Sequence, residues 1–181
     1  MKKILVLWAS PNTDGLTAAC AARALSGARS AAFAEDICLN NLALERCRVC
    51  ANGWGTCRSD GKYIIEDDFS ALYARMAEAD ALIVITPVYW GDLAEPLKTF
   101  LDRLRLCDLN GQKLMAQKRC LLVAAAGGTG NGTLSCLQNM ENTLRHLGMV
   151  PRDRLPITRF SREYMLPAIE EAAYTLAAEE E

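Results

Sequence analysis

The chain has 181 residues, of which 51% are hydrophobic and 23% charged, and its formal net charge is -2 at pH 7. That length fits one domain whose core is large enough to need no disulfide or metal for stability. The nearly balanced charge gives no reason to expect nucleic acid or an anionic membrane as a partner, and no apolar run approaches the roughly 18 residues that span a bilayer.

An export signal is one interpretation of the N-terminus, because Lys2 and Lys3 precede an apolar run over residues 4–9. That run is shorter than the roughly seven residues of a signal peptide, and no small-x-small cleavage site follows. We interpret it as a buried strand and expect a cytoplasmic location. The five scattered cysteines are then expected to be reduced, buried thiols: Cys20, Cys38, Cys107, Cys120 and Cys136.

Strands and helices alternate along the chain. Short apolar runs predict strands over residues 3–8, 32–39, 81–86 and 119–126, with a weaker fifth strand within 150–160. Helical patterns cover residues 16–25, 67–79, 92–106, 133–147 and 162–178. Gly27 is expected to end the first helix, and residues 40–66 form an irregular, cysteine-containing excursion. The predicted fold is therefore α/β, a three-layer sandwich around a parallel sheet in the order 2-1-3-4-5.

In such a sheet, ligands bind beyond the carboxyl ends of strands 1, 3 and 4. The first loop there covers residues 9–17 and joins a buried strand to a helix start, where unpaired N–H groups favour an anion such as phosphate. The predicted contacts are Ser10, Asn12, Thr13, Gly15, Leu16 and Thr17. The alternative is an ordinary helix start capped by Thr13 or Asp14.

The second loop places two large aromatic side chains directly after the most buried strand. A flat heteroaromatic ligand would cover them, and a nearby glycine allows the backbone to approach it closely. The predicted contacts are Pro87, Val88, Tyr89, Trp90 and Gly91. The alternatives are an aromatic plug between helix and sheet, or a subunit interface.

The third loop has four glycines within residues 127–132, which favours close backbone contact with a ligand. We expect Gly127, Gly128 and Thr129 to contribute, the alternative being a loop that is only flexible. Together the three loops suit a phosphorylated, planar cofactor. His146, the only histidine, lies late in a predicted helix, and no acid–base group is assigned, so the cofactor would carry its own chemistry.

Several segments resemble the NADPH-dependent FMN reductase family. The resemblance lies in residues 10–17, 67–69, 79–83, 86–91 and 97–103 and covers roughly the first three quarters of the chain. The first loop departs from the family pattern, because Ala9, Asn12 and Leu16 stand where Gly, Arg and Asn are usual.

The resemblance implies one flavodoxin-like domain over residues 1–181 that binds FMN. Ser10, Asn12 and Thr17 would face the phosphate, and residues 87–91 and 127–128 would flank the isoalloxazine. It also implies an oxidoreductase in which NAD(P)H reduces FMN, which passes electrons to flavin, quinone or another small-molecule or protein acceptor. Members of the family are typically homodimers or homotetramers.

An FMN electron carrier that docks to redox proteins without turning over NAD(P)H is the alternative function. Carriers of this fold are usually strongly acidic, and a net charge of -2 does not favour one. A flavin-free signalling domain is not supported, because the acidic cluster that it needs after the first strand is missing.

Three cysteines in the excursion, Cys47, Cys50 and Cys57, resemble the cluster motif of the iron–sulfur flavoproteins in this family, with one ligand of four missing. A four-iron cluster normally needs four thiolates. We therefore expect ordinary thiols packed at a subunit interface. A zinc site, or a cluster completed by a scattered cysteine, stays open as an alternative.

Overall fold

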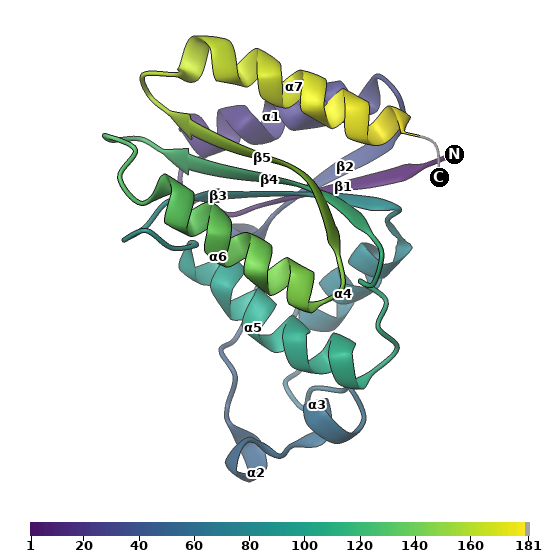
Figure 1. The fold of residues 1–181 in the computed structure, drawn as a ribbon. Coiled ribbons are helices and arrows are strands. Elements are labelled where there is room, and N and C mark those ends of the chain that lie inside the picture. Colours follow the sequence, from purple (N-terminus) through teal and green to yellow (C-terminus); the bar gives the residue numbers. More distant parts are fainter. Residues whose placement is uncertain (180–181) are drawn as a thin grey trace.

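The computed structural model describes residues 1–179 and has one five-stranded parallel sheet in the order β2-β1-β3-β4-β5 (Figure 1). The strands are β1 (Lys3–Trp8), β2 (Phe33–Cys38), β3 (Ala81–Pro87), β4 (Arg119–Ala126) and β5 (Val150–Thr158). The longer helices are α1 (Leu16–Arg29), α4 (Phe69–Glu78), α5 (Glu95–Asn110), α6 (Thr133–His146) and α7 (Arg162–Ala178). The predicted α/β sandwich and its strand order are confirmed.

Helices cover both faces of the sheet: α1 and α7 lie on one face, and α4, α5 and α6 on the other (Figure 1). The central strands β1, β3 and β4 are apolar at nearly every position because both of their faces are buried; the charged residues Lys3 and Arg119 stand at the amino ends of β1 and β4. β5 contains Pro151 and Pro156, which an edge strand tolerates.

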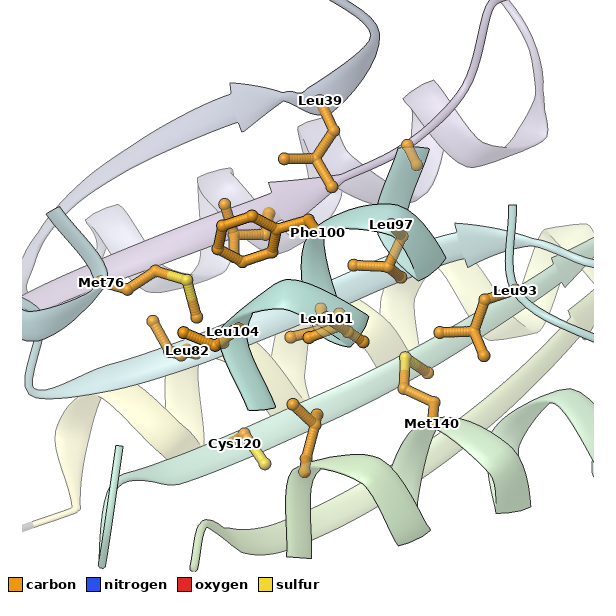
Figure 2. Close-up of a cluster of buried hydrophobic side chains, with 14 of the residues drawn as sticks. Leu39, Met76, Leu82, Leu93, Leu97, Phe100, Leu101, Leu104, Cys120 and Met140 are labelled. Atoms are coloured by element: carbon orange, nitrogen blue, oxygen red, sulfur yellow. The ribbon is translucent and has the colours of Figure 1, made fainter. Parts of the chain in front are cut away.

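The larger of the two apolar cores is built around α5. Figure 2 shows Leu97, Phe100 and Leu104 of this helix lying over the sheet. Leu82 of β3 lies beneath them, paired with Leu5 of β1 and Cys120 of β4. This packing fixes α5, and with it the loop that leads into α5 from β3.

The expected end of the first helix at Gly27 is wrong, because α1 continues to Arg29. Gly27 lies where α1 crosses α7. A Cβ atom there would come within 2.0 Å of the carbonyl oxygen of Glu170. The glycine therefore permits close helix packing. The bounds of two other helices also differ, since α4 begins at Phe69 and α5 runs from Glu95 to Asn110.

The excursion between β2 and α4 contains three short helical turns and projects beyond α5, away from the sheet (Figure 1). These are η1 (Leu39–Asn41), α2 (Cys50–Gly53) and α3 (Thr56–Ser59). Val49, Ala51 and Asn52 all have φ near +50°, a conformation that non-glycine residues seldom adopt.

One buried ion pair closes the base of the excursion. The guanidinium of Arg103 in α5 binds both carboxylate oxygens of Asp67 and donates to the carbonyl of Glu45 at 2.8 Å. It also lies against the rings of Tyr63 and Phe69. Because Glu45 and Asp67 stand at opposite ends of the excursion, Arg103 holds its two ends together.

None of the helices described in residues 1–179 is long and apolar enough to cross a membrane.

Candidate functional site

The three loops singled out by the sequence meet at the carboxyl edge of the sheet, where β1, β3 and β4 end side by side. Backbone hydrogen bonds join them to neighbouring strands. The N–H of Ala9 donates to Ile85 at 3.1 Å, and that of Val88 donates to Ala125 at 3.0 Å. The predicted site residues on these loops are thus brought together, although they lie over a hundred positions apart in the chain.

The first loop turns tightly after β1. The hydroxyl of buried Ser10 accepts the N–H of Asn12 at 3.1 Å, and the Asn12 and Thr13 side chains are exposed. Gly15 is the N-cap of α1 and supplies no side-chain bond. The alternative of a start capped by Thr13 or Asp14 is therefore wrong.

The first turn of α1 has the features of an anion site. Within residues 1–179, the N–H groups of Leu16, Thr17 and Ala18 have no hydrogen-bond partner, and the turn contains no acidic side chain. Thr17 is only 5% exposed, yet its hydroxyl likewise makes no hydrogen bond among the described residues. A phosphate at this position would satisfy these donors.

The second loop forms a two-residue hairpin turn at the sheet edge. Tyr89 and Asp92 exchange backbone hydrogen bonds of 3.0 and 2.9 Å, and the residues between them, Trp90 and Gly91, have φ of 54° and 76°. Trp90 is fully exposed and Tyr89 is also exposed, whereas Pro87 is buried and anchors the turn. The aromatic-plug alternative does not describe this loop, because the rings face outward.

Two backbone N–H groups of this turn are free to donate hydrogen bonds to a ligand. In the part of the chain that the structure describes, the N–H groups of Trp90 and Gly91 are unpaired. A left-handed φ at a tryptophan is unfavourable. Such strain is commonly found where backbone is shaped for function.

Helix α6 braces the second loop against the third. The hydroxyl of Ser135 lies 2.9 Å from the carbonyl oxygens of both Gly91 and Gly132. A Cβ on Gly132 would come within 2.5 Å of the Gly91 Cα, so only glycine permits this approach. The second and third loops are therefore packed directly against each other.

The third loop leaves open space beside its first glycines. A Cβ atom on Gly127 or Gly128 would meet nothing within 4 Å, and the N–H groups of Gly127, Gly128 and Thr129 have no partner within residues 1–179. All three residues are exposed. The carboxyl edge is thus an open shelf lined with unused backbone donors, which fits a flat ligand bearing carbonyl and ring-nitrogen acceptors.

A fourth loop reaches the same edge, and the sequence interpretation missed it. Residues 158–162 join β5 to α7, and Thr158 packs against Gly130 of the third loop. This loop carries two exposed cations, Arg159 and Arg162. Their position after a fifth parallel strand was the available signal, and the weakness of that strand in the sequence obscured it.

The cysteines of the excursion are not assembled into a ligand set. Cys57 is buried, whereas Cys47 and Cys50 are partly exposed. No group of three His, Cys, Asp or Glu side chains among residues 1–179 is placed to hold a metal ion. As arranged, these thiols do not fit a cluster that needs four thiolates.

Four of the five scattered cysteines are buried, as expected, and Cys38 is half-buried. Burial raises the pKa of the four buried thiols, Cys20, Cys107, Cys120 and Cys136, to about 12. They are protonated at neutral pH and poor nucleophiles, so they serve as core residues.

A doubly wound sheet in this order with an open carboxyl edge defines a flavodoxin-like protein. The family model of NADPH-dependent FMN reductase matches residues 2–158. The chain belongs to that family, which confirms the resemblance seen in the sequence.

Two curated relatives are iron-sulfur flavoproteins. That of Methanosarcina thermophila is 29% identical over 129 residues, covering 70% of this chain and 64% of that protein. That of Methanocaldococcus jannaschii is 29% identical over 160 residues, covering 87% of this chain and 80% of the relative. The chain thus spans just under two thirds of the Methanosarcina protein.

Among solved structures, the NAD(P)H:quinone oxidoreductase from Methanothermobacter marburgensis superposes with a TM-score of 0.78 at 19% identity. The superposition covers 99% of this chain and 98% of the other. At that identity the likeness concerns the fold, and it extends over the whole sheet and both helical layers.

Proposed function

We propose that the chain binds one FMN across the carboxyl edge of its sheet and is an NAD(P)H-dependent oxidoreductase that reduces a small acceptor such as flavin or quinone. The observation that carries the proposal is the first turn of α1. Its three open N–H groups and the unpartnered hydroxyl of Thr17, a residue that is only 5% exposed, would form a cradle for a phosphate monoester.

The predicted contacts divide the cofactor between the loops. Ser10, Asn12, Thr13 and the backbone of residues 15–17 would hold the phosphate. The hairpin turn of residues 87–91 would face the central part of the isoalloxazine with its two free N–H groups. The shelf of residues 127–129 would receive the pyrimidine end.

FMN, when bound, supplies the capacity to accept a hydride from NAD(P)H and to pass electrons on. The protein's part is to hold and orient it. The brace from Ser135 keeps the second and third loops at a fixed spacing, so their donors are set before the ligand arrives. The Trp90 ring, which is fully exposed in the protein without a ligand, would cover the bound ligand and exclude water from it.

Titration of the apoprotein with FMN and with riboflavin tests the phosphate cradle. Binding of FMN at least tenfold tighter than riboflavin is expected, and equal affinities would refute the cradle. Thr17→Asp should weaken FMN binding much more than riboflavin binding because it adds a negative charge, whereas Thr17→Val serves as the uncharged control and should cause only a modest loss.

The shelf is tested by Gly128→Val. The open space around this residue predicts an unchanged free energy of unfolding and a weaker affinity for both FMN and riboflavin, since the new side chain would occupy the place of the ring. An unchanged affinity would show that the ring does not lie against the third loop.

Steady-state oxidation of NADH and NADPH, with free FMN or a soluble quinone as acceptor, separates a reductase from an electron carrier. Turnover supports the reductase. Absence of turnover, together with rapid reduction of the bound FMN by a reduced ferredoxin, would favour the carrier instead.

A homodimer or homotetramer is part of the proposal. Large apolar side chains that the model leaves exposed lie on the loops and helix starts at the carboxyl edge: Tyr89, Trp90, Leu134, Phe160 and Tyr164. Covering them would offset the cost of exposing an apolar patch. Sedimentation of the FMN-loaded protein as a monomer at micromolar concentration would contradict this part.

A further inference from the structure

The proposed phosphate cradle lacks a cation of its own. Residues 9–17 include no Lys or Arg, and Asp14 adds a negative charge nearby. A phosphate monoester carries a charge of roughly -1.5 to -2 at neutral pH. Neutral N–H and hydroxyl donors at a helix start can bind such a group, but a guanidinium brought in from elsewhere in the fold would strengthen the binding considerably.

Helix α7 brings a cation to this region because it runs beside α1 in the same direction. Both helices begin at the carboxyl edge and cover the same face of the sheet (Figure 1). Their register is fixed by Glu170, which accepts hydrogen bonds from Arg23 at 2.7 Å and Ser26 at 2.6 Å. The contact between Gly27 and the Glu170 carbonyl fixes the same register.

The first turns of both helices lie roughly two helical turns before these contacts, so the two helix starts are at a similar level. There α7 begins with Arg162 and α1 has reached the open N–H groups of residues 16–18. The thiol of Cys20, one turn into α1, lies within electrostatic range of this cation. Burial raises the pKa of Cys20 to about 12, and the charge of Arg162 opposes that rise.

Local interactions do not explain an arginine at this position. Arg162 is exposed and forms no ion pair with any residue of the described chain. It occupies the first position of α7, where the positive end of the helix dipole disfavours a cation. An anion bound nearby would reverse that penalty.

We infer that Arg162 is a positioning residue for the phosphate of the bound flavin, reaching from α7 to the first turn of α1 and supplying the positive charge that the first loop lacks. This inference rests on the proposed function. It assigns a role to the loop after β5 that the three-loop description omits, and it makes the affinity for FMN depend on the packing of α1 against α7.

The test is the affinity of apoprotein for FMN and for riboflavin in wild type, Arg162→Gln and Arg162→Lys, measured by quenching of flavin fluorescence. Arg159→Gln is the matched control, because Arg159 lies in the same loop and is equally cationic but rests on the ring of Phe160. Removing the guanidinium of Arg162 should weaken FMN binding about tenfold, equivalent to about 1.4 kcal/mol, with riboflavin binding unchanged. Arg162→Lys should recover part of the loss.

Salt provides a second readout. The affinity for FMN should fall more steeply with ionic strength in the wild type than in Arg162→Gln. Only the wild type has the exposed charge pair between the Arg162 guanidinium and the phosphate, and salt screens such a pair. Equal salt slopes would contradict the inference.

The outcomes distinguish this inference from the proposed function. If wild type binds FMN and riboflavin equally, the phosphate cradle itself fails. If wild type prefers FMN but Arg162→Gln keeps the full preference, or loses no more than Arg159→Gln does, the cradle stands and the role of Arg162 is refuted.

Discussion

Replacement of Asp67 by Asn tests the buried pair at the base of the excursion. Arg103 is fully buried and Asp67 nearly so, and the carboxylate also accepts the N–H of Glu45 at 2.8 Å and that of Phe69 at 3.2 Å. The amide keeps the shape of the side chain but leaves a buried guanidinium without a counter-charge. Breaking a buried pair from one side costs about 3–5 kcal/mol, a large part of the roughly 5–15 kcal/mol that stabilises a domain.

We therefore expect Asp67→Asn to lower the free energy of unfolding in urea by about 3 kcal/mol at pH 7, and to speed amide hydrogen exchange in the excursion. Asp102→Asn is the matched control. It removes the exposed pair of Asp102 with Lys98, one helical turn apart in α5, and surface pairs of this kind contribute at most about 1 kcal/mol. A loss in Asp67→Asn no larger than in the control would refute the reasoning.

The same pair sets a pH dependence. Burial alone would raise the pKa of Asp67, but hydrogen bonds from Arg103 and from the N–H groups of Glu45 and Phe69 outweigh it, so the pKa lies below its ordinary value. A carboxylate whose pKa is lowered by folding stabilises the native state above its unfolded pKa and loses that contribution as pH falls through the folded value. The stability gap between wild type and Asp67→Asn should hold from pH 8 to 5 and narrow below about pH 4.

Three further predictions concern the rest of the fold. Gly27→Ala should lower the free energy of unfolding by about 1–3 kcal/mol despite the higher helix propensity of alanine, since its Cβ meets a carbonyl of α7; an unchanged urea midpoint would contradict this. Hydrogen bonds from Arg154 and Arg145 outweigh the effect of burial and lower the pKa of Glu141 to about 2. Glu141→Gln should therefore have a lower free energy of unfolding than the wild type at pH 7. The difference in free energy of unfolding should narrow as the pH falls from 4.5 to 2, where Glu141 becomes protonated. Trp90→Gly should leave the urea midpoint unchanged or raise it, by removing a left-handed tryptophan, while weakening FMN binding; a clear drop in stability would show that the ring supports the fold itself.

The sheet was predictable from the sequence because buried parallel strands have a simple signature. Apart from one charged residue at the start of β1 and of β4, and Thr86 near the end of β3, the three central strands are continuously apolar, and the handedness of crossover connections leaves few orders for them. Once the order is known, the loops that meet at one edge are known as well. This is why the hydroxyl-rich first loop, the aromatic second loop and the glycine-rich third loop could be predicted to lie together without any contact information.

Features that depend on packing between distant elements were not predictable. Gly27 has the local appearance of a helix stop, and only the approach of α7 shows why the helix continues through it. The partnership of Arg103 with Asp67 joins residues 36 positions apart, and no local pattern indicates it. The position of Arg162 near the first turn of α1 can be inferred only when the register of α7 against α1 is known.

The cysteine excursion and the carboxyl edge meet in one element, helix α5. Its middle carries Arg103, which closes the excursion, and its start follows the second loop, where the N–H of Ala94 donates to the hydroxyl of Thr86 at 3.0 Å. Between these points α5 is fixed by buried side chains such as Leu97 and Phe100, which leave it little freedom to shift (Figure 2). A disturbance of the excursion should therefore be absorbed locally. Because this packing holds α5 in place, the carboxyl edge of the sheet is expected to keep its geometry in Asp67→Asn even when the excursion opens.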